Sequence, residues 1–419
     1  LATFAVEGYY GLELTEITLT DENGNSVANN PALFLELELQ VERYYDLNTS
    51  QSPTLNYHQL AADPENLKIY WTYQPGAEYS ELEWVFYDSY KANGGTFTYG
   101  ELFTDTDSRY GTDPFKIGGT RIDLKAQEYS IPLVYPRGFL IYRVRSIGVA
   151  GSDFDERVEG KWSKPKYFEI TEAEAYEADK NWQYRANYAE NGLRSTSMKY
   201  LDGSLRNRQN ISRDNVNNKS LVGEVLYDYH GRPALSIPTV PTGVQSLKYD
   251  TDFVKKTATE TYSWKDFDKA VEGCPDPAPI ADSLHPGSAV SEYYSSEGNF
   301  LGVNRDLVPR VDKYGFAQTV YTPDQTGRVA ISGGLTEDFQ PGEAHAVQNY
   351  YLPVAQDELY RIFGSEAANA SYFTRQLTKD ANGQMSVTMT DHLGRTVATA
   401  LTGKAPKNLD PLDGFNEET

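Results

Sequence analysis

The stretch YDYHGRPALSIP, residues 227–238, contains the pattern that decides the fold, an Asp-x-x-Gly-Arg string set between apolar residues. The string occurs three times, as DYHGR at 228–232, DQTGR at 324–328 and DHLGR at 391–395. At ordinary residue usage, about 0.1 copies would arise by chance in a chain of this length. The string is therefore a repeat. A fourth, degenerate copy is DGSLR at 202–206.

The residue types of this repeat are those of a β-hairpin turn. An aspartate at the first position of a turn accepts hydrogen bonds from backbone N–H groups two residues on, and glycine adopts positive φ without a Cβ clash. The arginine opens the returning strand, within reach of the aspartate or of a carboxylate on a neighbouring hairpin. Because a single hairpin is marginally stable, such units are expected to stack side by side. The predicted structural turn residues are Asp202, Asp228, Gly231, Arg232, Asp324, Gly327, Arg328, Asp391, Gly394 and Arg395.

Composition agrees with an all-β fold. The 419 residues include 32 Tyr and only 3 Met, with abundant Gly and Pro, which favours strands and turns over helix bundles. A single cysteine excludes an internal disulfide framework and every multi-cysteine metal motif. The formal charge of −22 argues against a nucleic-acid partner. No apolar run approaches the roughly 18 residues of a membrane span, and no cofactor or metal is expected.

The N-terminal part of the chain shows the alternation of half-buried strands. Candidate strands lie between Glu13 and Val41 and at 66–73, 81–88 and 138–151. In the last of these, apolar residues alternate with Ile141, Arg143 and Arg145, which predicts one apolar face and one basic, wetter face. Residues 35–168 resemble a fibronectin type III domain through Trp84, Tyr142, Val144, Trp162, Ser163 and Pro165. The region is longer than such a module, and a polar insertion from Lys91 to Asp113 is expected to hold the excess.

The predicted domain organisation has three parts. Residues 1–169 form a fibronectin-like β-sandwich region, 170–182 form a charged linker or short helix, and 183–419 form the hairpin region. A helix is expected at 356–364, with Gly364 as its stop signal.

Residues 180–403 closely resemble the RHS or YD-repeat family, named for the Tyr-Asp pair found here at Tyr227 and Asp228. The segments that carry the resemblance, in the expected order, include NWQYRANYAENG (181–192), VGEVLYDYHGRPALSIPTVP (222–241), YTPDQTGRV (321–329) and DANGQMSVTMTDHLGRTVATALTG (380–403). They are most typical of Bacteroidota members. The resemblance implies the opening portion of a hollow β-shell in a non-enzymatic, secreted or cell-surface bacterial protein, with export by the type IX pathway. The implied partners are the rest of the shell with an enclosed C-terminal toxin, or secretion and surface proteins.

Other readings of individual residues remain open. His230 and His392 lie inside two turns and could suggest acid-base chemistry, but Thr326 replaces the histidine in the second copy, which favours a structural turn. The acidic stretches at 21–25 and 105–113 have oxygen ligands at alternate positions, as calcium loops do, yet lack the rest of an EF-hand. The many tyrosines offer stacking platforms for a glycan, so a glycan-binding or adhesive module is the alternative function. A hydrolase with unrecognised carboxylates ranks last.

Overall fold

The computed structural model describes residues 18, 20–27, 45–47, 51–60, 63–91, 95–104, 113–116, 118–150, 155–189, 192–214, 219–243, 246–268, 280–294, 307–311 and 313–402. The chain divides into two compact units, Leu1–Asp46 and Leu47–Thr419. In the first unit, the bridge between Thr20 and Ser26 closes a short turn. Most of the stretch from Glu13 to Val41, where strands are expected, lies outside the described residues.

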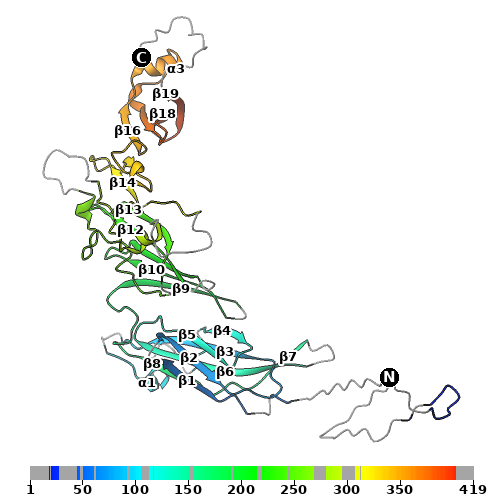
Figure 1. The fold of residues 1–419 in the computed structure, drawn as a ribbon. Helices are drawn as coiled ribbons and strands as arrows, with labels where there is room; N and C mark the ends of the chain where they lie inside the picture. Colours follow the sequence, from blue (N-terminus) through cyan, green and yellow to red (C-terminus); the bar gives the residue numbers. More distant parts are fainter. Residues whose placement is uncertain are drawn as a thin grey trace. The chain divides into compact units, whose positions relative to one another are not determined.

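The fold is all-β, as the composition predicts, with nearly every strand in an antiparallel sheet (Figure 1). The N-terminal part of the second unit is a β-sandwich. Its smaller sheet has the order β1-β2-β5, and its larger sheet has the order β4-β3-β6-β7, with β8 also paired to β6. The strands are β1 (Leu55–Leu60), β2 (Asp63–Trp71), β3 (Tyr79–Asp88), β4 (Thr120–Leu124), β5 (Glu128–Pro132), β6 (Gly138–Ala150), β7 (Glu156–Glu159) and β8 (Lys166–Ile170).

The core of the sandwich comes from alternate residues of both sheets, so the strands expected at 66–73, 81–88 and 138–151 correspond to β2, β3 and β6. Leu67 and Ile69 of the smaller sheet pack with Trp84 of β3 and with Tyr142 of β6. Ser163 ties the segment before β8 to β6, because its N–H donates to the carbonyl of Val144 at 2.8 Å and its hydroxyl accepts the Val144 N–H at 3.1 Å. The expected insertion contributes helix α1 (Tyr99–Thr104).

The outer face of the larger sheet is less exposed to solvent than the sequence pattern predicts. Arg145 is only 8% exposed, and its Nε lies 2.5 Å from a carboxylate oxygen of Glu81. Arg143 donates to Glu83 at 2.7 Å, and both guanidinium groups lie under the Trp162 ring, 4.3 and 4.5 Å from its centroid. Opposite charges on neighbouring strands and a covering indole therefore bury a face that alternation alone marks as solvent-exposed.

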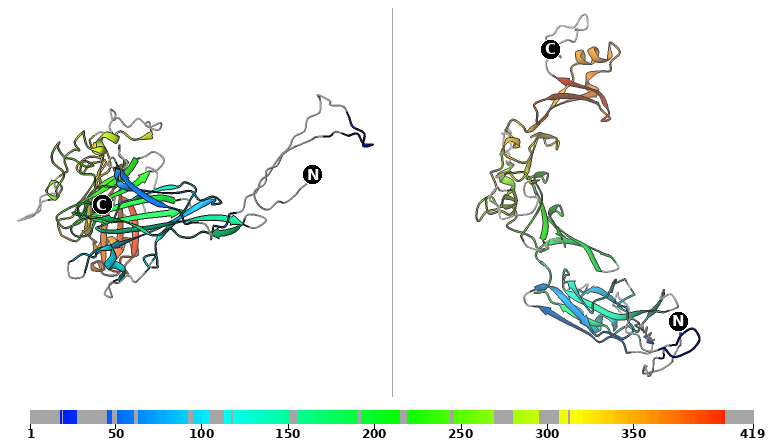
Figure 2. Two further views of the ribbon diagram at one scale, coloured as in Figure 1. Left: turned by 90° about the horizontal axis from the view of Figure 1, so that it is seen from below. Right: turned by 45° about the vertical axis from the view of Figure 1, so that its right-hand side comes forward.

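The hairpin region forms one 11-stranded antiparallel sheet whose strands follow one another in chain order from β9 to β19 (Figures 1 and 2). The strands are β9 (Asn181–Ala189), β10 (Gly192–Leu201), β11 (Asn207–Asp214), β12 (Lys219–Tyr227), β13 (Pro233–Pro241), β14 (Ala317–Tyr321), β15 (Val329–Ser332), β16 (Val347–Pro353), β17 (Phe373–Lys379), β18 (Met385–Asp391) and β19 (Thr396–Thr402).

The linker expected at 170–182 contains turns and no helix, and β9 begins inside it at Asn181. Glu177 adopts a φ of 35° there, and its carboxylate accepts the Tyr249 N–H at 3.0 Å and the hydroxyl of Tyr200. The linker is thus fastened to the hairpin region by a side chain. The helix expected at 356–364 is α3 (Gln356–Phe363), which ends before Gly364.

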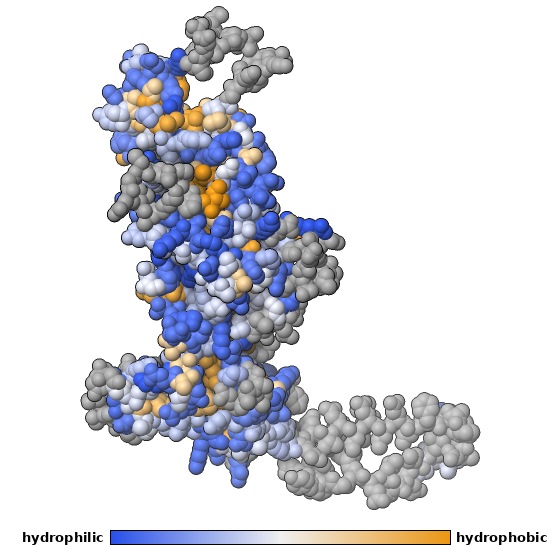
Figure 3. All heavy atoms as spheres, turned by 60° about the vertical axis from the view of Figure 1, so that its left-hand side comes forward, coloured by the Kyte–Doolittle hydropathy of each residue, from blue (hydrophilic) through white to orange (hydrophobic). Residues whose placement is uncertain are grey.

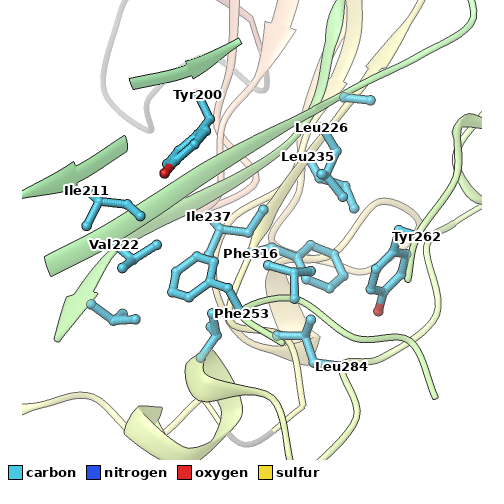
Figure 4. Packing of buried hydrophobic residues seen from close by; sticks show 14 of the residues in the cluster. Tyr200, Ile211, Val222, Leu226, Leu235, Ile237, Phe253, Tyr262, Leu284 and Phe316 are labelled. Carbon is cyan, nitrogen blue, oxygen red and sulfur yellow. The ribbon is translucent and has the colours of Figure 1, made fainter. Parts of the chain in front are cut away.

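Between β13 and β14 the chain leaves the sheet and folds back over it as a cap, which here means the described residues from 242 to 316. Phe253, Tyr262 and Phe316 of this cap pack with Leu235 and Ile237 of β13 (Figure 4). Helix α2 (Ala289–Tyr294) belongs to the cap as well. Burial by the cap gives the middle of the sheet its core.

A smaller core lies beneath α3, where Leu359 meets Met389 of β18. Elsewhere on β16 to β19 apolar side chains reach the surface, among them Tyr350, Leu352 and Leu401, and apolar surface is visible in several places in Figure 3. No described helix is long and apolar enough to span a membrane.

Candidate functional site

Three of the four repeat turns share one hydrogen-bond pattern, shown here for the turn that begins at Asp228. The Asp228 N–H donates to the Arg232 carbonyl at 2.9 Å, and the Gly231 N–H donates to the Asp228 carbonyl at 3.0 Å. One carboxylate oxygen accepts the Arg232 N–H at 2.8 Å while the other accepts its Nε at 2.6 Å. The turns at Asp202 and Asp391 repeat all four contacts. The aspartate therefore closes the loop and orients the arginine.

The fourth residue of each of these turns has a left-handed backbone. The φ angles are +80° at Gly231 and +78° at Gly394, and the degenerate copy places Leu205 in the same region at +60°. A Cβ at Gly394 would meet no atom within 4 Å, so glycine is favoured there by its backbone and not by lack of space. Leu205 carries the conformational cost that the glycines avoid.

The DQTGR turn has the same sequence pattern but a different geometry. The loop is longer, since the pairing of Tyr321 with Val329 leaves residues 322–328 unpaired, and the Thr322 N–H closes it on the Arg328 carbonyl at 2.8 Å. Asp324 binds Thr322 and Thr326 and makes no ion pair with Arg328 among the described contacts. Hydroxyl donors from these two threonines lower its pKa to about 2.

Two further turns share the backbone hydrogen bonds of the turn at Asp228, although they have no arginine. DANGQ at 380–384 and DENGN at 21–25 both close through their aspartate, with Gly383 and Gly24 at positive φ. Neither turn fits the Asp-x-x-Gly-Arg pattern, because Gln384 and Asn25 stand in place of the arginine. In the second, considered above as a calcium loop, Asp21 already accepts the N–H groups of Asn23 and Asn25 at 2.9 Å. Most of the other acidic stretch, 105–113, lies outside the described residues.

Each of the first three arginines packs against a tyrosine of the next hairpin. The guanidinium carbon of Arg206 lies 4.4 Å from the ring centroid of Tyr227, and that of Arg232 lies 4.3 Å from Tyr321. Arg328 lies 5.1 Å from Tyr351. These are cation–π distances. The repeat pattern predicts only a carboxylate partner for the arginine, and nothing in it points to the tyrosine.

The tyrosine hydroxyl completes the same contact in all three places. It donates to the carbonyl of the residue that follows the arginine, from Tyr227 to Asn207 at 2.6 Å and from Tyr321 to Pro233 at 2.9 Å. The third bond, from Tyr351 to the carbonyl of Val329, is 3.1 Å long. We call the combined ring and hydroxyl contact the arginine–tyrosine interlock.

Sheet register explains why the interlock recurs. The pairing of Gln209 with Glu224 places Arg206 directly opposite Tyr227, since the strands are antiparallel. Extended by three residues, the pairings Leu235–Gln318 and Ile331–Gln348 likewise place Arg232 opposite Tyr321 and Arg328 opposite Tyr351. The Asp-Gly-Arg turns therefore join neighbouring hairpins as well as the two strands of their own hairpin.

The two turn histidines do not come together with a base and a nucleophile. His230 lies edge-on to Tyr229 of the same turn, and His392 lies against Tyr372. The carboxylate of Asp391 is bound to Arg395. The Arg395 backbone N–H lowers the pKa of this carboxyl, burial of the carboxyl opposes that effect, and the Arg395 guanidinium lowers the pKa further. These contacts are those of a turn.

The most deeply buried carboxylate of the hairpin sheet, that of Glu224, has a polar partner at each of its two oxygens. The Glu224 carboxylate forms an ion pair with Arg208, whose Nε lies 2.9 Å away, and it accepts hydrogen bonds from Gln209 Nε2 and the Tyr249 hydroxyl, both at 3.2 Å. Burial beneath the cap raises its pKa. Gln209 also pairs with both backbone groups of Asp250, so this cluster fixes the cap to the sheet.

A cavity of about 440 Å³ lies beside the linker, lined by Tyr90, Arg137, Tyr176, Lys180 and Trp182, among others. Arg137 covers the Tyr90 ring at 4.2 Å and holds Glu172 at 2.8 Å, and Lys180 holds Asp179 at 2.9 Å. Its cations are thus already paired. Among the residues the structure describes, no group of three or more His, Cys, Asp or Glu side chains could hold a metal ion.

No protein-family model and no curated protein matches this sequence.

Proposed function

We propose that this chain is a non-enzymatic structural segment of a secreted or cell-surface bacterial RHS-repeat protein. In this proposal a fibronectin-like sandwich precedes the opening portion of a β-shell, and the shell encloses a C-terminal domain or forms a surface structure. The observation that carries the proposal is the arginine–tyrosine interlock, which links successive hairpins into one wall at Tyr227, Tyr321 and Tyr351.

Three properties support a role as a wall. The strands follow chain order across the whole sheet, as expected if hairpins are added one after another. The aspartate and arginine side chains of the turns bind one another, the backbone or neighbouring side chains. This arrangement suits a structural role better than catalysis. The formal charge of −22 keeps such a protein dispersed through self-repulsion, as a wall exposed to solvent requires.

Localisation and proteolysis test the proposal together. Antibodies against the purified chain would be applied to intact cells, lysed cells and culture medium of the producing bacterium. Labelling of intact cells, or recovery from the medium, is expected; labelling of lysed cells alone would overturn the proposal.

The natural polypeptide, purified from the same source, would then be treated with a nonspecific protease. We expect the hairpin region to survive as a large fragment identified by mass spectrometry. Rapid cleavage throughout β9 to β19 would show that these hairpins form no wall.

A further inference from the structure

Strand β19 has one open edge. It pairs with β18 on one side, and within the described part of the chain no strand pairs with its other side. An edge strand presents unpaired N–H and C=O groups that can take up a further strand. The side chain of Leu401 on this strand is 75% exposed.

Arg395 differs from the other turn arginines in what lies beside it. Asp391 holds its guanidinium at 2.7 Å, in the way that Asp202 and Asp228 hold theirs. However, the Arg395 side chain is 73% exposed, compared with 35% for Arg206 and 22% for Arg232. Across the described residues, Arg395 is the one arginine of the four repeat turns with no tyrosine ring over it.

We propose that the open edge of β19 binds an antiparallel β-strand that carries a tyrosine opposite Arg395. The ring lies on the guanidinium, and the tyrosine hydroxyl donates to the Thr396 carbonyl. This is the geometry already present three times in the sheet, so the proposal continues an observed interface. It deepens the proposed function by naming what the wall recognises at this end, and it rests on that function.

The contact sets register as well as affinity. Main-chain hydrogen bonds along an edge are indifferent to sequence, and a strand can slip along it by two residues without loss of pairing. A tyrosine that must lie opposite Arg395 removes this freedom, because only one alignment brings ring, guanidinium and carbonyl together. The partner is therefore a tyrosine-bearing strand and not any extended peptide.

A peptide from the chain itself is the natural probe. Residues 345–354, HAVQNYYLPV, include β16 with Tyr351, which makes the interlock with Arg328 inside the protein. A fluorescein-labelled peptide of this sequence would be titrated into the full chain and followed by anisotropy. We expect saturable binding that weakens about two- to tenfold with Tyr351→Phe in the peptide, because one hydrogen bond is lost.

The protein variant Arg395→Gln is expected to weaken binding by a similar factor, whereas Arg194→Gln, which removes an exposed arginine from β10, leaves it unchanged. Because Arg395→Gln also removes an ion pair to Asp391, the peptide variant serves as the test that leaves the protein intact. A benzophenone in place of Tyr350 in the peptide should crosslink to residues 395–402.

Absence of saturable binding, equal affinity of the Tyr351→Phe peptide, or crosslinks confined to other strands would each overturn the proposal. These readouts use purified components. Peptide binding by the purified chain and labelling of intact cells are therefore independent results, and failure of one proposal can be told from failure of the other.

Discussion

Replacement of Leu205 by glycine should stabilise the hairpin formed by β10 and β11. Leu205 holds a left-handed φ of +60° that costs a residue with a Cβ about 1–2 kcal/mol. Its side chain is 68% exposed, so little packing is lost with it. Glycine also lowers the stability by about 0.5–1 kcal/mol, because it gives the unfolded chain more conformational freedom. The net gain expected is about 0.5–1 kcal/mol.

Native-state hydrogen exchange resolves this change to one hairpin. Amides of β10 and β11 should exchange about two- to fivefold more slowly in Leu205→Gly than in the parent chain, since about 1.4 kcal/mol corresponds to tenfold. The reverse change, Gly394→Leu, is the matched control, because that turn has the same hydrogen bonds and open space around its glycine. It should accelerate exchange in β18 and β19. Faster exchange in Leu205→Gly would refute the reasoning, and would mean that the leucine contributes packing that outweighs its backbone cost.

Four more outcomes follow from the contacts. Gly327→Val should cost roughly 1–3 kcal/mol because its φ is +76°, and an unchanged melting temperature would contradict this. Tyr321→Phe should cost about 0.5–1.5 kcal/mol through loss of the hydroxyl bond, and a double-mutant cycle of Tyr321→Leu, which removes the ring, with Arg232→Ala should show coupling, whereas strict additivity would rule out the ring–guanidinium contact. Glu83→Gln leaves Arg143 and Arg121 with a neutral partner and should cost about 3 kcal/mol or more by urea unfolding; a loss below about 1 kcal/mol would show that solvent replaces the carboxylate. The pKa of Asp391 lies below its ordinary 3.8 in the folded state, so its stabilisation is present above that pH and disappears as the pH falls through the folded value; the melting-temperature gap between parent and Asp391→Asn should shrink from pH 6 to pH 3, and a constant gap would contradict the linkage.

Local signals in the sequence were sufficient for the strands and for most turns. Alternation located β3 and β6, the apolar spacing before Gly364 located α3, and the Asp-x-x-Gly-Arg string located the turns at Asp228 and Asp391. Each of these depends on residues within one turn or one strand. The string was less reliable at Asp324, because Thr322 competes for its carboxylate and lengthens the loop.

Features that depend on distant partners could not be predicted. The cap has no periodic pattern, and its Phe253 and Tyr262 are buried only because the chain returns to β13. The tyrosine of each interlock is specified by the register between separate hairpins, and nothing local to Tyr351 marks it for Arg328. Arg145 appeared exposed because the carboxylates that bury it lie on another strand.

The three interlocks have nearly the same geometry although very different lengths of chain separate their partners. The hydroxyl bonds join residues 20, 88 and 22 positions apart, and the longest of these spans the whole cap. Contact between two hairpins thus places no demand on the segment that connects them. An insertion at such a connection leaves the joint intact, and removal of a complete hairpin would present the preceding arginine to the next tyrosine. A protein built in this way can gain, lose or decorate units by recombination at hairpin boundaries without redesign of its joints.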